Sequence, residues 1–248
     1  MKFAIVDGRM SEKCKNTLTN LGFQLVALPS NPCYDTSISA HPDIFIFDCC
    51  GEYLVDRSVF PIANKQMFFC GEQDVTKRFT VVGENGVGQV RYPHDCSLNF
   101  AVCGRYMIGN FCYAAQGVLD LAAKYALTPI SVRQGYAKCN VCPVSDEALI
   151  TEDTGIAAAC RDVGLDVLLL EKHVVSLPGY PYGFIGGAAS TLITVNGQQT
   201  LLFCGDIKAH PEYERIRCFC RSYGVQPVAL SDEPLCDYGS VFLVDDAR

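Results

Sequence analysis

Two cysteines three positions apart, Cys139 and Cys142, lie in the segment RQGYAKCNVC (133–142). Such a pair can bind a metal, can cycle between dithiol and disulfide, or can supply one reactive thiol beside a structural one. If the segment is extended, the two side chains point to opposite faces and lie about 10 Å apart, so they share neither a metal nor a disulfide. We therefore expect no metal and no cofactor. Cys139 is predicted to face a central site, and Cys142 is predicted to pack into a sheet.

Two interpretations of Cys139 stay open. In the first, Cys139 is a nucleophile whose pKa is lowered by Lys138 or by a nearby imidazole, and His94 in YPHDC (92–96) is the preferred acid/base candidate. In the second, Cys139 is one more buried thiol among the 15 cysteines of the chain. The first interpretation predicts that a neutral alkylating agent labels Cys139 before the other thiols.

Composition narrows the class of protein. The chain has 248 residues, of which 49% are hydrophobic, and no linker interrupts it, so a single domain over residues 1–248 is expected. A net charge of −7 with dispersed Lys and Arg argues against nucleic acid as a partner. The apolar runs are far shorter than the roughly 20 residues that span a membrane. We expect a soluble, cytoplasmic protein whose partner is a small polar molecule; the oligomeric state stays open.

A helix followed by a strand recurs along the chain. Apolar residues at i, i+4 and i+7 predict amphipathic helices, each ending at a glycine or, once, at Ala126. The first apolar residues of the four patterns are Cys14, Val118, Ile156 and Ile216. The strands expected after them are FQLVAL (23–28), LTPISV (127–132), LDVLLL (165–170) and VQPVAL (225–230). A fifth, weaker helix is predicted around Val75, Phe79 and Val82.

Five copies of about 50 residues, each too small to bury its own apolar face, are predicted to stack around a common axis as one α/β fold. The first strand, FAIVDGR (3–9), and the last, FLVDDAR (242–248), are expected to be neighbours and so to close the ring. An open sheet of βαβ units is the alternative.

This pattern resembles the pentein fold, also called the guanidine-group-modifying enzyme fold, a five-bladed α/β propeller with pseudo-five-fold repeats around a central pocket. The segments QGYAKC (134–139), ALITEDTGIA (148–157) and LPGYPYGFIGGA (177–188) are similar to an uncharacterised bacterial branch of that fold. Catalytic members act on guanidino or amidino compounds with a Cys nucleophile, a His and acidic residues at the axis. The resemblance implies that the substrate-binding residues here are Asp43, Asp95, Asn99, Gly186, Gly187 and Asp237, next to Cys139.

Two parts of the family's catalytic set have no counterpart in place. The family nucleophile precedes the last strand, where this chain has Gly239, and the expected His is missing from GFIGGAAST (183–191). Two functions are therefore expected. One is a Cys-dependent hydrolase or transferase, similar to amidinohydrolases and deiminases, that acts on C–N bonds with Cys139 as a displaced nucleophile. The other is a non-catalytic protein that binds a small polar or cationic molecule. An interaction module like the family's ribosome-binding branch is disfavoured because no basic face is evident.

Overall fold

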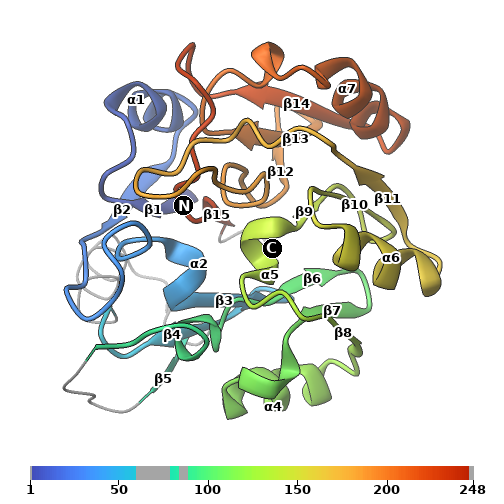
Figure 1. The fold of residues 1–248 in the computed structure, drawn as a ribbon. Coiled ribbons are helices and arrows are strands. Elements are labelled where there is room, and N and C mark those ends of the chain that lie inside the picture. Colours follow the sequence, from blue (N-terminus) through green and yellow to red (C-terminus); the bar gives the residue numbers. More distant parts are fainter. Residues whose placement is uncertain (1, 60–78, 84–88, 246–248) are drawn as a thin grey trace.

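The computed structural model describes residues 2–59, 79–83 and 89–245. Within these ranges the strands β1 to β15 form five sheets of three strands each. The sheets are arranged around two short helices, α2 (Pro42–Phe45) and α5 (Ala137–Asn140), as Figure 1 shows. The architecture is an α/β fold of five small sheets.

All five sheets share one connectivity. A first strand pairs antiparallel with a middle strand, and the middle strand pairs parallel with a third. In four sheets the three strands follow one another in the chain. These strands are β3 (Ile46–Cys49), β4 (Glu52–Asp56) and β5 (Phe79–Val82); β6 (Ala101–Cys103), β7 (Tyr106–Gly109) and β8 (Thr128–Ser131); β9 (Cys142–Pro143), β10 (Ala148–Thr151) and β11 (Asp166–Leu169); β12 (Ile193–Val195), β13 (Gln198–Phe203) and β14 (Val225–Ala229).

The fifth sheet joins the two ends of the chain. Its middle strand β1 (Lys2–Asp7) pairs parallel with β2 (Gln24–Leu28) and antiparallel with β15 (Phe242–Asp245). The predicted pairing of the first and last strands is therefore confirmed. Without β15, β1 would present an unpaired edge.

In the ranges that the structure describes, four helices make crossovers of the kind that parallel strands require. They are α1 (Glu12–Asn20), α4 (Gln116–Lys124), α6 (Thr154–Asp162) and α7 (Tyr213–Ser222), and each connects a middle strand to the third strand of its sheet. All four match helices predicted from the apolar spacing. Just beyond them the chain turns at Gly22, Ala126, Gly164 and Gly224, all with positive φ. None of the helices in the described ranges is long and apolar enough to cross a membrane.

The core consists of five apolar clusters, and each cluster is shared by two neighbouring sheets. One cluster brings Phe3 and Ile5 of β1 against Val55 of β4. The next brings Phe47 of β3 against Met107 of β7. Because every sheet buries apolar side chains against both of its neighbours, the apolar contacts hold the five sheets in a ring.

Two local predictions are wrong. Phe79 and Val82, expected in a fifth helix, lie in strand β5, while Val75 lies outside the described residues. The segment from Cys139 to Cys142 is not uniformly extended, because Cys139 belongs to the one-turn helix α5 and only Cys142 is in a strand. The Asn99 side chain stabilises that turn: its Oδ1 accepts the backbone N–H groups of Lys138 (2.7 Å) and Cys139 (3.4 Å).

Candidate functional site

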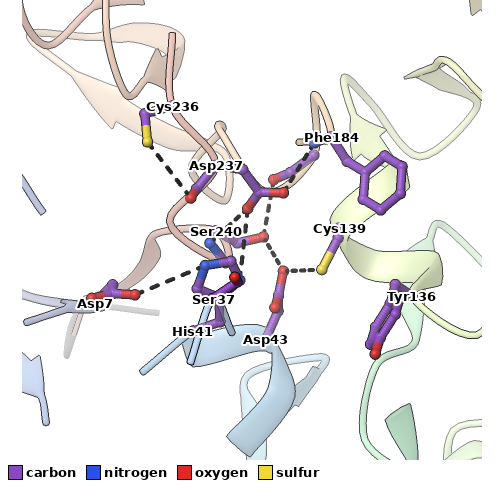
Figure 2. Close-up of polar contacts among 12 residues, drawn as sticks. Asp7, Ser37, His41, Asp43, Tyr136, Cys139, Phe184, Cys236, Asp237 and Ser240 are labelled. Atoms are coloured by element: carbon purple, nitrogen blue, oxygen red, sulfur yellow. Dashed lines mark hydrogen bonds and ion pairs between the residues drawn. The ribbon is translucent and has the colours of Figure 1, made fainter. Parts of the chain in front are cut away.

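Polar side chains gather where the segments that lead into the first strands of several sheets meet. Asp43 precedes β3, Asn99 precedes β6, Cys139 precedes β9, and Asp237 and Ser240 precede β15. We call these five residues, with Lys138, the central cluster. All six are buried, and most of them are linked by hydrogen bonds. Figure 2 shows Asp43, Cys139, Asp237 and Ser240 converging from α2, α5 and the C-terminal segment.

Cys139 is held between a carboxylate and an amide. Its Sγ lies 3.0 Å from Oδ2 of Asp43, to which the thiol donates, and it accepts a hydrogen bond from Nδ2 of Asn99 at 3.3 Å. The same amide nitrogen donates to the backbone carbonyl of Asp43 at 2.9 Å. Asn99 thereby fixes the position of the thiol relative to the carboxylate.

Ser240 connects the other side of Asp43 to a lysine. Its Oγ lies 2.9 Å from Nζ of Lys138, 3.0 Å from Oδ2 of Asp43 and 2.9 Å from the carbonyl oxygen of Gly186. Ser240 has a φ of 68°, a left-handed conformation that is costly for a residue with a Cβ. These contacts keep the hydroxyl at the centre of the cluster despite the strain.

Gly186 and Gly187 allow the backbone to approach the cluster closely. A Cβ on Gly186 would lie 2.5 Å to 2.7 Å from three carbonyl oxygens of the segment 138–141, and a Cβ on Gly187 would lie 2.0 Å from Oδ1 of Asp237. The N–H of Gly187 donates to the carbonyl of Cys139 at 2.7 Å. Both positions therefore exclude any side chain.

His41 lies between two carboxylates. Its Nδ1 is 3.8 Å from Oδ1 of Asp237, and its Nε2 is 3.9 Å from Oδ2 of Asp7 (Figure 2). Burial lowers the pKa of His41, which favours the neutral imidazole. Asp7 in turn accepts hydrogen bonds from the guanidinium of Arg9.

Burial controls the ionisation of the central cluster. It raises the pKa of Asp43 and of Asp237, and Lys138 partly offsets the effect at Asp43. It also raises the pKa of Cys139 well above the usual value, and the carboxylates of Asp43 and Asp237 raise it further. The prediction that Lys138 or an imidazole lowers this pKa is therefore wrong: Cys139 is only 3% exposed and faces carboxylates.

Asp95 and His94 are separated although they are adjacent in sequence. They lie in a 3-10 turn, His94–Cys96, in which successive side chains diverge. Asp95 is buried and accepts the hydroxyl of Tyr136 at 2.9 Å, and burial raises its pKa. His94 is exposed and makes a T-shaped contact with Tyr113, with 6.2 Å between the ring centroids. The structure thus does not place His94 against Cys139 as an acid/base would require.

Sequence reasoning missed three residues that belong to the site. Ser240 lies two residues before β15 and next to Gly239, the position at which the resemblance expected the family nucleophile. His41 precedes a proline, and this pattern predicts a turn residue. Glu152 occurs in the recognised segment 148–157; its Oε2 accepts the N–H of Ile185 at 2.9 Å, and burial raises its pKa to about 7.

The described residues include no group of three or more His, Cys, Asp and Glu side chains placed to bind a metal ion. Buried carboxylates can accept N–H groups from a cation, and a thiol lies next to one of them.

Comparison with known proteins gives the family. Residues 5–242 match the model of a family described as "Family of unknown function (DUF6873)". The chain belongs to this family. No curated protein sequence matches the chain.

Solved structures with the same fold are penteins. DDAH from Pseudomonas aeruginosa, a Cys-to-Ser mutant complexed with citrulline, matches with a TM-score of 0.54 and 10% identity over 93% of this chain and 91% of that one. A His-to-Gly mutant of dimethylarginine dimethylaminohydrolase, an adduct with S-methyl-L-thiocitrulline, matches with a TM-score of 0.53 and 10% identity over 93% and 92%. This DUF6873 chain therefore has the pentein fold, in a branch of unknown function.

Proposed function

We propose that this protein binds a small guanidino or amidino compound at its central cluster. In this proposal residues 1–248 form one domain, a five-bladed propeller whose axis carries the ligand site. Asp43 and Asp237 would accept N–H groups of the planar cation, and the backbone at Gly186 and Gly187 would let it approach closely.

The observation that carries the proposal is an unpaired carboxylate oxygen. Asp43 is fully buried, and its Oδ1 has no hydrogen-bond partner among the described residues, while its Oδ2 contacts Cys139 and Ser240. A buried polar atom without a partner costs free energy that a ligand can recover. A group with fixed N–H donors and a positive charge would satisfy Oδ1 and neutralise the carboxylate.

The structural relatives support this class of ligand. The two DDAH structures contain citrulline and an S-methyl-L-thiocitrulline adduct, both small amino acids with a planar group on the side chain. An acidic interior in this chain suits the cationic counterparts of such groups. Because the central cluster is buried, entry of a ligand would require the segments that cover it to separate.

A Cys-dependent hydrolase is the second candidate, and the contact between Cys139 and Asp43 favours it. Burial raises the pKa of Asp43, so its carboxylate is a stronger base than usual. In this reaction the thiol proton would pass to Asp43, and Sγ would form a bond to the guanidinium carbon. The C–N bond would then break, an amine would leave with a proton, and water would release the thiol.

Calorimetric titration of arginine, agmatine and a neutral urea analogue tests the binding proposal. We expect the cations to bind and Asp43→Asn to weaken their binding at least about tenfold, because the variant loses a charged acceptor. Asp162→Asn, which changes an exposed aspartate on α6, is the matched control and is expected to bind as the unmodified protein does. Failure of every guanidino and amidino compound to bind would contradict the proposal.

Product assays distinguish the two candidates. Release of ammonia, urea or citrulline from a bound compound would establish the hydrolase if the release is lost in Cys139→Ser but not in Cys112→Ser. Cys112 is the control because it is exposed and is not part of the central cluster. Binding without product in any of these proteins would leave the non-catalytic binding protein as the function.

A further inference from the structure

A second cavity lies at the other end of the strands that start from the central cluster. It has a volume of about 590 Å³. The central cluster precedes these strands, whereas the cavity is lined by residues near their far ends and in the turns after them, among them Asp48, Cys103 and Asp146. We call it the distal cavity. Its size is typical of small-molecule sites.

Lys138 is shared by the central cluster and the distal cavity. In the central cluster its backbone N–H donates to Asn99 and its Nζ contacts Ser240, and the residue also lines the distal cavity. The side chain is 8% exposed, and Nζ lies 5.8 Å from the centre of the Phe242 ring. Among the described residues, Ser240 Oγ is the hydrogen-bond partner recorded for Nζ. An ammonium group has three N–H donors, so two remain for a ligand.

The walls of the distal cavity differ in polarity from floor to rim. Lys138, Phe100 and Phe242 are buried and form the floor, whereas Asp146 and Cys50 are exposed and form the rim. The floor therefore offers a positive charge near the Phe242 ring, and Phe100 adds apolar surface.

The rim is acidic. Asp48, Glu52 and Asp146 line the distal cavity near its opening. Glu52 is partly neutralised by Lys124, which lies 2.5 Å from its Oε1. Asp146 is exposed on the turn that follows β9. A simple anion would be repelled by this rim before it reached Lys138, whereas a molecule with a positive group at its outer end would be attracted.

We propose that the distal cavity is a second binding site, for a small zwitterion of the α-amino acid type. The carboxylate of the ligand binds Nζ of Lys138 at the floor. Its apolar part packs between Phe100 and Phe242, and its ammonium group faces the carboxylates at the rim. This site shares Lys138 with the central cluster but does not use Asp43 to hold its ligand.

The absence of tryptophan from the chain provides a direct test. Tyr125 lines the distal cavity at its rim, so Tyr125→Trp places a single fluorophore there. This protein is titrated with each proteinogenic L-α-amino acid other than tryptophan. We expect a saturable fluorescence change with at least one of them, and none with the matched reporter Tyr113→Trp, which lies outside the cavity. The amide of the same amino acid, which lacks the carboxylate, is expected to bind at least about tenfold more weakly.

Two further substitutions in the Tyr125→Trp protein test the assigned contacts. Lys138→Met is expected to weaken binding at least about tenfold, and Asp146→Asn about two- to fivefold, as for a partly exposed charge. If Lys138→Met fails to fold, the weaker binding of the amide and the effect of Asp146→Asn on binding still test the proposal. Because Tyr125 lines the distal cavity and is not part of the central cluster, the response reports on the distal cavity. No saturable response to any amino acid, or equal binding of the amide and the acid, would overturn the proposal.

Discussion

The thiol of Cys139 lies 3.0 Å from Oδ2 of Asp43, although the two residues are 96 positions apart in the sequence. This contact has opposite consequences for its two partners. Burial and, after it, the carboxylate raise the pKa of the thiol well above its usual value, which favours the protonated form of Cys139. For Asp43, the thiol donor stabilises Oδ2, while Oδ1 has no hydrogen-bond partner in the part of the chain that the structure describes. A bound cation would change both properties together by neutralising the carboxylate.

Alkylation of the thiols measures the first consequence. With iodoacetamide near pH 8, we expect Cys139 to be modified at least about tenfold more slowly than the exposed Cys50, Cys112 and Cys218, because it is buried and its pKa is raised. Mass mapping of partly labelled native protein gives the order of modification. Early labelling of Cys139 would restore the interpretation of this residue as an activated nucleophile. Labelling in a denaturing concentration of guanidinium chloride is the control, because unfolding exposes every thiol to the reagent.

Glu152 makes stability depend on pH. Burial raises its pKa in the folded protein to about 7 from an ordinary value of 4.5. The folded state holds the proton more tightly than the unfolded state, so the contribution of Glu152 to stability is greatest below pH 4.5 and falls as pH rises toward 7. The difference between the two pKa values corresponds to roughly 3 kcal/mol.

Glu152→Gln is therefore expected to become more stable relative to the unmodified protein as pH rises from 4.5 to 8, by up to roughly 3 kcal/mol. Urea unfolding at several pH values measures this difference. Glu147→Gln, an exposed neighbour in the sequence, is the control and is expected to show little such change. A stability difference that does not vary with pH would show that Glu152 titrates normally.

Much of the fold follows from local signals in the sequence. Apolar spacing at i, i+4 and i+7 with a closing glycine locates four helices, because both the buried face and the left-handed turn are properties of a few neighbouring residues. Closure of the ring was predicted from the number of repeats and from the strand-like sequences at both ends of the chain. The helix predicted around Phe79 was wrong because its apolar residues are also compatible with a strand. Phe79 and Val82 lie in β5, which pairs parallel with β4.

The candidate site was less accessible to prediction. The residues that precede the first strands could be named, since the repeat defines equivalent positions. The direction of each side chain could not, because it depends on turns such as the one that separates His94 from Asp95. The contact between Lys138 and Ser240 joins residues 102 positions apart, and no local pattern encodes it. Burial of Cys139, which sets its reactivity, is likewise a property of the assembled ring.

Gly187 tests how tightly the central cluster is packed. A Cβ at this position would lie 2.0 Å from Oδ1 of Asp237, so Gly187→Ala must displace a buried carboxylate that also accepts the N–H groups of Phe184 and Gly239. We expect a loss of about 1–3 kcal/mol in the free energy of unfolding. Gly155→Ala, inside helix α6, is expected to be neutral or to stabilise by up to about 1 kcal/mol. Equal effects at the two positions would contradict the close approach at Gly187.

Ser240 allows backbone strain to be separated from hydrogen bonding. Ser240→Ala and Ser240→Gly both remove the hydroxyl that contacts Lys138, Asp43 and Gly186, and each is expected to cost about 1–3 kcal/mol. Only alanine keeps the penalty of a Cβ at a φ of 68°, so the glycine variant is expected to be the more stable of the two, by about 0.5–1 kcal/mol.

Ser190 supplies the matched comparison. It is also buried and its hydroxyl is also hydrogen-bonded, but its φ is not positive. At Ser190 the order must therefore reverse, with the alanine variant more stable than the glycine variant by about 0.5–1 kcal/mol, because glycine loses more conformational entropy on folding. Urea unfolding of the four variants gives the two differences. If alanine is the more stable residue at both positions, Ser240 is not strained, and its hydroxyl is held at the central cluster by hydrogen bonds without opposition from the backbone.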